Sequence, residues 1–163
     1  MTRFKTAVFG AGFVGRVHIE GLRRLGNVEV YALVAAESDQ PARLGQSLYI
    51  DRTDSDYRRV LEDPAVDVVH ICTPNALHSP MATDALQAGK HVLCEKPLAI
   101  STGQARQLVA LAAETRRRNC TFHNLRFYPQ VQQMRAMREA GELGEILVVQ
   151  GTYSQDWLLY DTD

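Results

Sequence analysis

Three glycines near the N-terminus have the spacing of a loop that binds the phosphates of a dinucleotide. They lie in a G-x-G-x-x-G pattern. The first glycine permits a tight turn, the second lets the backbone approach a pyrophosphate, and the third lets a helix pack closely on a strand. The alternative is a turn without a ligand, but the motif follows a predicted strand and opens a predicted helix, whose N-terminus attracts phosphate. The candidate coenzyme-binding residues of this loop are Gly10, Gly12, Phe13, Val14 and Gly15.

Such a loop is usually followed by an acidic residue at the end of the second strand, where it binds the ribose 2′-hydroxyl of NAD. The expected position is Ala35, and Glu37 comes two residues later. Without a carboxylate at Ala35, the 2′-phosphate of NADP meets less repulsion, and Ser38 or Arg43 could contact it. The sequence therefore leaves NADP open as the coenzyme, and also NAD through a shifted Glu37.

Two polar clusters follow later apolar runs, at the carboxyl ends of strands where ligands bind in open α/β sheets. The first cluster comprises Thr73, Pro74, Asn75 and His78. The second comprises Glu95, Lys96 and Pro97. Either cluster alone is typical of a turn or a solvated ion pair. Two of them beside a phosphate-binding loop favour a ligand site.

A parallel sheet with helices on both faces would position these residues. Apolar runs predict strands over 6–9, 28–35, 66–72, 91–94 and 120–122. Near-continuous apolar strands that alternate with helices are typical of such a sheet. Helical spacing predicts a helix over 15–25. Ser79 before Pro80 predicts the start of a second helix, and Ser101 with Gln104 forms a capping box for a third.

The pattern changes after Asn124. Pro129 and the spacing over 131–140 predict a helix, and alternation over 145–153 predicts a strand with no strand to pair with. The sequence therefore predicts a first domain over 1–124 and the incomplete start of a second over 125–163.

Composition narrows the class of protein. The chain has 163 residues, of which 45% are hydrophobic and 23% charged, as in a soluble globular protein. The net charge of -1 gives no support to nucleic-acid binding. The apolar runs are too short to cross a bilayer, and no secretory signal precedes the first strand. Three scattered cysteines indicate reduced thiols and a cytoplasmic location; we expect them to fill the core.

Together these motifs resemble the Gfo/Idh/MocA family of NAD(P)-dependent oxidoreductases. The resemblance covers essentially the whole chain and rests on matching elements in the family's order. These elements are Gly10–Gly15 with His18, Asp56-Tyr57 leading to Leu61, Thr73-Pro74-Asn75 with His78, Glu95-Lys96-Pro97, and Asn124–Pro129. The implied fold is a Rossmann-type doubly wound parallel sheet, followed here by the first helix and strand of a truncated second α/β domain.

The resemblance also implies roles for single residues. Lys96 corresponds to the active-site lysine, whose ammonium would stabilise the substrate oxygen as hydride leaves for the nicotinamide. Pro97 would turn Lys96 into the cleft, with a cis bond possible, and Glu95 would orient Lys96. Thr73, Pro74, Asn75 and His78 would contact the coenzyme along its ribose and nicotinamide side. Arg126 could reach the cleft.

Two histidines have simpler explanations. We expect His18 to serve packing or a local hydrogen bond and His70 to be a satisfied core residue.

Family members carry a second domain that supplies an acid/base residue and contacts between subunits. The chain is therefore expected to be the nucleotide-binding part of an enzyme that oxidises or reduces a sugar or polyol, a homo-oligomer at full length and inactive alone. The alternative is a non-catalytic NAD(P)-binding sensor or scaffold. Metal ligands are not expected.

Overall fold

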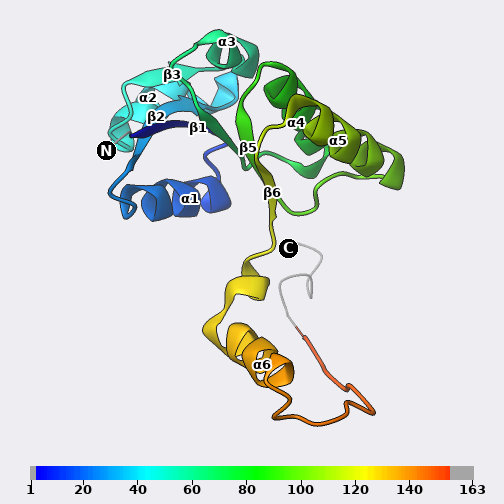
Figure 1. Cartoon of the computed structure of the whole chain (residues 1–163). Helices are drawn as coiled ribbons and strands as arrows, with labels where there is room; N and C mark the ends of the chain where they lie inside the picture. Colours follow the sequence, from blue (N-terminus) through cyan, green and yellow to red (C-terminus); the bar gives the residue numbers. More distant parts are fainter. Residues whose placement is uncertain (1–2, 155–163) are drawn as a thin grey trace. The chain divides into compact units, whose positions relative to one another are not determined.

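The structure is a computed structural model that describes residues 3–154. Six parallel strands form one sheet with the order β3-β2-β1-β4-β5-β6 (Figure 1). Their bounds are β1 Phe4–Phe9, β2 Val28–Val34, β3 Arg52–Asp54, β4 Val68–Ile71, β5 His91–Glu95 and β6 Asn119–Phe122. The order reverses direction between β1 and β4, which is the switch point where doubly wound sheets bind ligands. The predicted fold class is confirmed.

Helices connect successive strands. They are α1 Phe13–Arg23, α2 Pro41–Ser47, α3 Tyr57–Glu62, α4 His78–Gln87 and α5 Thr102–Thr115. Short 3-10 turns, η1 Glu37–Asp39 and η2 Asn75–Leu77, precede α2 and α4. Each long connection returns the chain to the end of the sheet at which the next strand must start, as parallel pairing requires. In the described residues no helix is both long and apolar enough to cross a membrane.

The helices cover the sheet on both faces, and each face has its own core. On one face Ile19 and Leu22 of α1 pack against Val8 and Leu33 of the sheet. On the other face residues of α3, α4 and α5 pack against alternate strand residues such as Val69. Figure 1 shows α1 and the α4–α5 pair on opposite sides of the sheet. This arrangement places the carboxyl ends of β1, β4 and β5 next to one another.

Helix starts agree with the sequence in one case and differ in another. Ser101 accepts a hydrogen bond from the Gln104 amide at 3.2 Å and so caps α5, as predicted. The predicted cap of the preceding helix was wrong, because α4 begins at His78 and Ser79 is buried within its first turn. The 3-10 turn η2 already supplies helical backbone before Pro80, so the helix begins earlier.

Chain contacts separate a second unit that begins at Asn124. It contains η3 Asn124–Phe127 and α6 Pro129–Glu139, which agrees with the predicted helix. The predicted strand over 145–153 is not formed, and these residues have no regular secondary structure. A strand needs a partner for its backbone groups, and the described part of this unit offers none. Ile146, Leu147, Val148 and Val149 are exposed.

Candidate functional site

The glycine loop leaves β1 through a turn that only glycine accommodates. Gly10 has φ +88°, in the left-handed region that side chains disfavour. A Cβ atom on Gly10 would lie 2.6 Å from the carbonyl oxygen of Cys72. The loop after β1 is therefore pressed against the backbone that leaves β4, and the two loops share one end of the sheet.

The other two glycines of the motif differ in what surrounds them. A Cβ on Gly15 would lie 2.0 Å from the Gly10 carbonyl oxygen, so Gly15 is required for packing of α1 against the loop. A Cβ on Gly12 would have no protein atom within 4 Å. Nothing inside the described protein explains a glycine there. A ligand that approaches the backbone closely would explain the glycine, and a pyrophosphate needs such an approach.

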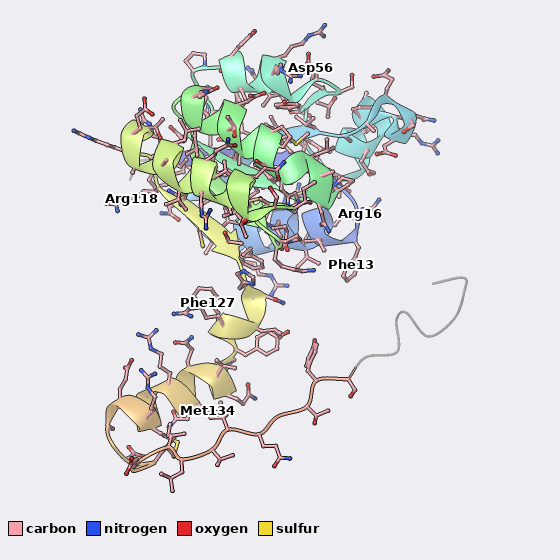
Figure 2. The ribbon with its side chains drawn as sticks, turned by 90° about the vertical axis from the view of Figure 1, so that its right-hand side faces the viewer. Phe13, Arg16, Asp56, Arg118, Phe127 and Met134 are labelled. Carbon is pink, nitrogen blue, oxygen red and sulfur yellow. The ribbon has the colours of Figure 1, made fainter. Side chains whose placement is uncertain are left out.

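The N-terminus of α1 suits an anion. Gly12 is the residue before the helix and provides no side-chain cap, and the first turn contains no acidic residue. The free amide groups and the positive end of the helix dipole therefore remain available. Phe13, which is 85% exposed, and Arg16 both project from this end of α1 (Figure 2). Arg16 Nε donates to the Ala11 carbonyl at 3.3 Å, which places a positive charge beside the loop.

The loop after β4 is joined to the loop after β5 by His78. The ring of His78 is only 1% exposed; its Nε2 lies 2.8 Å from the Thr73 carbonyl oxygen and its Nδ1 2.6 Å from the Pro97 carbonyl oxygen. Both ring nitrogens are thus engaged with backbone. In the structure His78 joins these two loops, and its contact with the coenzyme stays a prediction of the sequence. Pro74 and Asn75 are exposed beside it, and Thr73 is half-buried.

The loop after β5 carries the lysine singled out by sequence. Glu95 is buried, and its Oε2 accepts a hydrogen bond from the backbone amide of Lys96 at 3.1 Å. The Lys96–Pro97 peptide is cis, and the Lys96 side chain is exposed. Glu95 therefore contacts Lys96 through its backbone, while the ammonium can reach a ligand.

A buried cluster of two histidines and Glu95 lies behind this loop. His18 Nε2 lies 3.0 Å from Glu95 Oε1, and His18 Nδ1 lies 2.9 Å from His70 Nδ1. All three residues are less than 9% exposed. Burial, with a smaller contribution from His18, lowers the pKa of His70 to about 4. His70 is buried and hydrogen-bonded, as expected, and His18 packs on Phe122 and forms hydrogen bonds. Their partners were not predicted, although strand alternation could have placed His70 on the face that α1 covers.

The remaining motif residues serve the fold. Asp56 caps α3 by accepting a hydrogen bond from the Arg58 amide, and Leu61 is buried. The Tyr57 hydroxyl donates to Asp84 at 2.7 Å; burial and that carboxylate raise the pKa of Tyr57 to about 12. These contacts fix α3 against α4.

Arg126 lies in η3 of the second unit, where its carbonyl accepts a hydrogen bond from the Gln132 side chain. Within that unit the Arg126 side chain is exposed. The other predicted site residues all belong to the first unit.

Residues after β2 form a separate surface groove. Ala35 is buried, so its position has no room for an exposed acid, whereas Glu37 is exposed at the start of η1. Ser38 and Arg43 line a groove of about 290 Å³ that also includes Asp39 and Gln40. Ser38 and Arg43, which were considered as contacts for a 2′-phosphate, therefore line the same groove.

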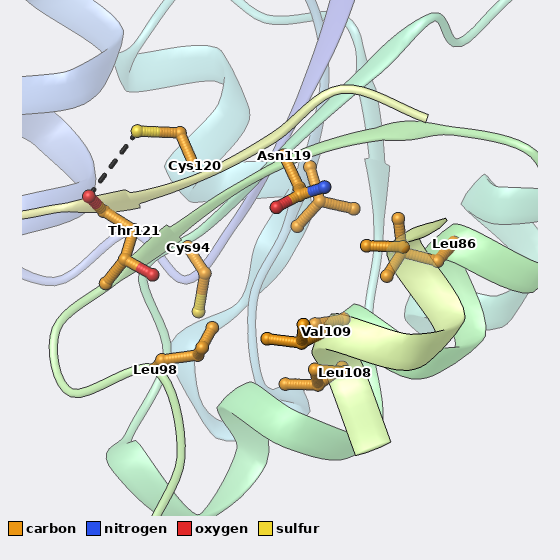
Figure 3. Close-up of a pocket in the computed structure, with 11 residues that line it drawn as sticks. Leu86, Cys94, Leu98, Leu108, Val109, Asn119, Cys120 and Thr121 are labelled. Carbon is orange, nitrogen blue, oxygen red and sulfur yellow. Dashed lines mark hydrogen bonds between the residues drawn. The ribbon is translucent and has the colours of Figure 1, made fainter. Parts of the chain in front are cut away.

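The cysteines lie apart from this chemistry. Burial, followed by the Glu95 charge, raises the pKa values of Cys72 and Cys94 to about 12, so both are unreactive thiols. Cys120 is exposed, contrary to the expected core position, because the described residues place no strand beyond β6. A cavity of about 50 Å³ lies between α5 and the strands that carry Cys94 and Cys120, and Figure 3 shows the residues that line it. It is too small for a nucleotide.

Comparison with known proteins places the chain in a family. Residues 4–123 match the Gfo/Idh/MocA family, described as an oxidoreductase family with an NAD-binding Rossmann fold. The uncharacterized oxidoreductase YrbE of Bacillus subtilis is 33% identical over 85% of this chain and 41% of its own length. Levoglucosan dehydrogenase of Pseudarthrobacter phenanthrenivorans is 30% identical over 96% of this chain and 42% of its own length.

Solved structures show the same likeness. An NAD-binding oxidoreductase from Klebsiella pneumoniae superposes with a TM-score of 0.84 at 32% identity, over 88% of this chain and 40% of that chain. A levoglucosan dehydrogenase with NADH bound gives a TM-score of 0.84 at 27% identity, over 90% of this chain and 41% of that chain. The chain thus spans about two fifths of the length of these relatives. It belongs to the Gfo/Idh/MocA oxidoreductase family, and residues 4–123 form its NAD-binding Rossmann domain.

Proposed function

We propose that the chain is the coenzyme-binding part of an NAD(P)-dependent dehydrogenase that acts on a sugar or polyol. The observation that carries this proposal is the meeting of three loops at the sheet's switch point. Gly10 packs against Cys72, and His78 joins Thr73 to Pro97. His18 joins α1 to Glu95. The open space above Gly12 and the exposed Lys96 thus lie at the same end of the sheet, where the strands have their carboxyl ends.

The residues present suit a nicotinamide coenzyme, which would supply the hydride acceptor or donor. Gly12, Phe13 and Val14 would hold its pyrophosphate on the first amides of α1. Thr73, Pro74 and Asn75 would line its ribose and nicotinamide side, with Glu95 behind them. The Lys96 ammonium would donate a hydrogen bond to the substrate oxygen. It would thereby stabilise negative charge on that oxygen during hydride transfer.

The substrate class follows from the relatives. Levoglucosan dehydrogenase, D-apiose dehydrogenase and myo-inositol 2-dehydrogenase are among the similar proteins, and each is named for a sugar or polyol. Levoglucosan and myo-inositol are therefore the first probes for activity. Reduced cysteines and a nicotinamide coenzyme suit the cytoplasm, which is the location we propose.

The second unit is proposed to begin the substrate and oligomerisation domain of the full-length protein. Leu147, Val148 and Val149 are more than 80% exposed in this unit. A run of exposed apolar side chains is favourable only when another surface covers it. We propose that the rest of that domain and a second subunit provide the cover, and that Arg126 contributes to the substrate side. Sedimentation of the full-length protein tests this, and a monomer at micromolar concentration would contradict it.

For the adenosine end, we propose that the groove of Ser38 and Arg43 accepts the 2′-phosphate of NADP. Support comes from the missing acid at Ala35 and from Arg43, for which the described residues hold no ion-pair partner. Arg43→Ala should then weaken NADPH binding about tenfold and leave NADH binding unchanged. Tighter binding of NADH than of NADPH by the unmodified chain would assign the ribose to Glu37 instead.

The test of the reaction is substitution of the lysine in the full-length protein. Lys96→Ala should lower kcat by about 100-fold or more, with little change in the coenzyme Kd, because the ammonium acts on the substrate oxygen. Lys5→Ala is the matched control. Lys5 lies near the start of β1, at the end of the strand remote from the glycine loop, so this variant should retain full activity. Loss of coenzyme binding without a specific loss of kcat would contradict the proposed role of Lys96.

A further inference from the structure

His78 is a buried side chain whose two ring nitrogens both face hydrogen-bond acceptors. It is the first residue of α4 and is only 1% exposed. Its Nε2 lies 2.8 Å from the Thr73 carbonyl oxygen, and its Nδ1 lies 2.6 Å from the Pro97 carbonyl oxygen. A carbonyl oxygen only accepts hydrogen bonds, so both ring nitrogens must donate for both contacts to be favourable.

A neutral imidazole cannot make both of these hydrogen bonds. It has one N–H group and one bare nitrogen. In either neutral tautomer, the bare nitrogen would face a carbonyl oxygen at 2.8 Å or less, with lone pair against lone pair. A proton on each nitrogen turns both contacts into hydrogen bonds. His91 shows the contrast, because its Nδ1 accepts the Arg118 amide at 3.0 Å and a neutral ring satisfies that contact.

The lengths of the two contacts agree with a charged donor. N–H···O hydrogen bonds in proteins are about 2.7 to 3.2 Å long, and charged donors give the shorter and stronger ones. The contact with Pro97, at 2.6 Å, is below this range, and the contact with Thr73, at 2.8 Å, is near its lower limit. The positive end of the α4 dipole and burial both oppose a charge on His78, so the two charge-assisted bonds must outweigh these costs.

The loops that His78 joins contain few other titratable groups. Cys72 leads into the loop after β4, and Cys94 precedes the loop after β5. Burial, followed by the charge of Glu95, raises the pKa values of both thiols to about 12, so they stay neutral. The loop after β5 also carries Glu95, which is buried, and Lys96, which is exposed. Glu95 is therefore the carboxylate that these loops bury near the His78 ring.

The charged groups on the neighbouring helices have other partners or are exposed. On α4 the only charged side chain besides His78 is Asp84. Asp84 accepts a hydrogen bond from the Tyr57 hydroxyl at 2.7 Å and pairs with Arg58 at 3.5 Å. On α5, which packs against α4, the charged side chains Arg106 and Glu114 are exposed. The carbonyl oxygens of the two loops are thus the direct partners of the His78 ring.

The two carbonyl groups belong to the loops that form the proposed site. Thr73 follows β4 and lies on the proposed coenzyme side, whereas Pro97 directly follows Lys96. Glu95 Oε2 accepts the Lys96 amide at 3.1 Å, which holds the lysine backbone on one side. His78 holds the next carbonyl group on the other side. Because the Lys96 side chain is exposed, the backbone sets the direction in which it leaves the loop.

We propose that His78 is a positioning residue that acts as an imidazolium and holds the loop of Thr73 at a fixed separation from the loop of Lys96. Its two N–H groups donate to the two carbonyl oxygens, and no proton leaves or reaches the ring during the reaction. Loss of either proton makes one contact repulsive, so the two loops can then separate. This inference rests on the proposed function, because Lys96 is the group that acts on the substrate oxygen.

The first test uses the chain itself and needs no substrate. Side-chain ¹⁵N NMR, followed over a titration between about pH 5 and 8, should show His78 with protons on both ring nitrogens. Wherever the ring loses one proton, the carbonyl ¹³C signals of Thr73 and Pro97 should shift with it. Titration of His91 is the control and should leave both carbonyl signals unchanged. A His78 ring that stays neutral throughout, or that titrates without a change at either carbonyl, would overturn the proposal.

The second test is a double-mutant cycle in the full-length protein, with levoglucosan or myo-inositol at saturating coenzyme. His78→Gln has one side-chain nitrogen and cannot donate to both loops, so kcat should fall about tenfold. In a Lys96→Ala background the same change should lower kcat by less than about twofold, because the lysine that His78 positions is already absent. His91→Gln is the matched control and should leave kcat unchanged in both backgrounds.

The outcomes separate a positioning role from a purely structural one. Equal fold losses from His78→Gln with and without Lys96, measured per folded protein, would overturn the positioning role. If His78→Gln does not fold, the ring titration of the unmodified chain decides the matter. A full-length protein that binds coenzyme but oxidises neither probe would contradict the proposed function, and the titration would still decide whether a charged His78 holds both loops.

Discussion

The glycines of the first loop are needed for different physical reasons. Gly10 has a backbone conformation that side chains disfavour, Gly15 lies against a backbone oxygen, and Gly12 has no protein neighbour. The spacing in the sequence predicted the turn at Gly10 and the packing at Gly15, and the close approach of a pyrophosphate to Gly12 stays a prediction. Stability measurements can therefore separate a glycine required by the fold from one required by a ligand.

Gly15→Ala should destabilise the chain by about 3 kcal/mol, since its Cβ would lie 2.0 Å from the Gly10 oxygen and the backbone must shift. Gly21→Ala in the same helix has no atom within 4 Å and should instead stabilise by about 0.5 to 1 kcal/mol through helix propensity. Urea denaturation measures both. Equal free energies of unfolding for the two variants would contradict the packing described.

His70 should make stability depend on pH. Its folded pKa of about 4 lies below the unfolded value of about 6.5, so only the unfolded chain binds this proton between those values. The free energy of unfolding should therefore fall by at most about 3 kcal/mol as the pH drops from 6.5 to 4. His70→Gln should remove this part of the slope and His91→Gln should retain it. A slope that is unchanged in His70→Gln would exclude a buried, neutral His70.

Sequence reasoning did not predict which residues contact one another across the site. The two polar clusters were predicted because their residue types and their places after strands are visible in the sequence. The contacts of His78 with Thr73 and Pro97 were not, since these residues lie 5 and 19 positions from it and belong to loops after two different strands. The His18–Glu95 contact spans 77 residues. Distances of this kind arise from the strand order, which a local pattern does not contain.

At the scale of elements, the long apolar strands and the capped start of α5 were predictable, whereas the start of α4 and the short elements were not. β3 has three residues, α3 six and α2 seven. A helix of six or seven residues has fewer than two turns, and a strand of three residues has a single alternation. The sequence pattern of such elements is therefore not distinguishable from that of a loop. Their stability comes from packing against β2 and α4 rather than from their own sequence.

The cap of α5 is an element whose energy can be measured. Ser101→Ala removes the acceptor for the Gln104 amide and should cost about 1 kcal/mol of unfolding free energy. Ser101→Thr keeps a hydroxyl oxygen and should cost less than about 0.5 kcal/mol. Thermal or urea unfolding distinguishes the two. An equal loss in both variants would indicate that the side-chain oxygen does not act as the cap.

At the scale of the molecule, the strand order brings motifs from the first 100 residues to one end of the sheet, where the strands have their carboxyl ends. The same order pairs β2 with β3, so Ala35, directly after β2, is buried and donates its backbone amide to the Asp54 carbonyl at 3.2 Å. The alternation of apolar strands with helices predicted a parallel sheet covered on both faces, and the family resemblance implied the doubly wound fold, but the strand order itself was not predicted. The strand expected over 145–153 did not form, because the described residues offer it no strand to pair with.

Coenzyme titration of Gly12→Ala tests the central claim most directly. The open space at Gly12 predicts that the variant unfolds within about 0.5 kcal/mol of the unmodified chain, because no protein atom meets the new methyl group. It also predicts that NADH or NADPH binding, followed by nicotinamide fluorescence, weakens at least about tenfold, while Gly21→Ala binds normally. Unchanged affinity in Gly12→Ala, or no binding of either coenzyme to the unmodified chain at millimolar concentration, would contradict the account.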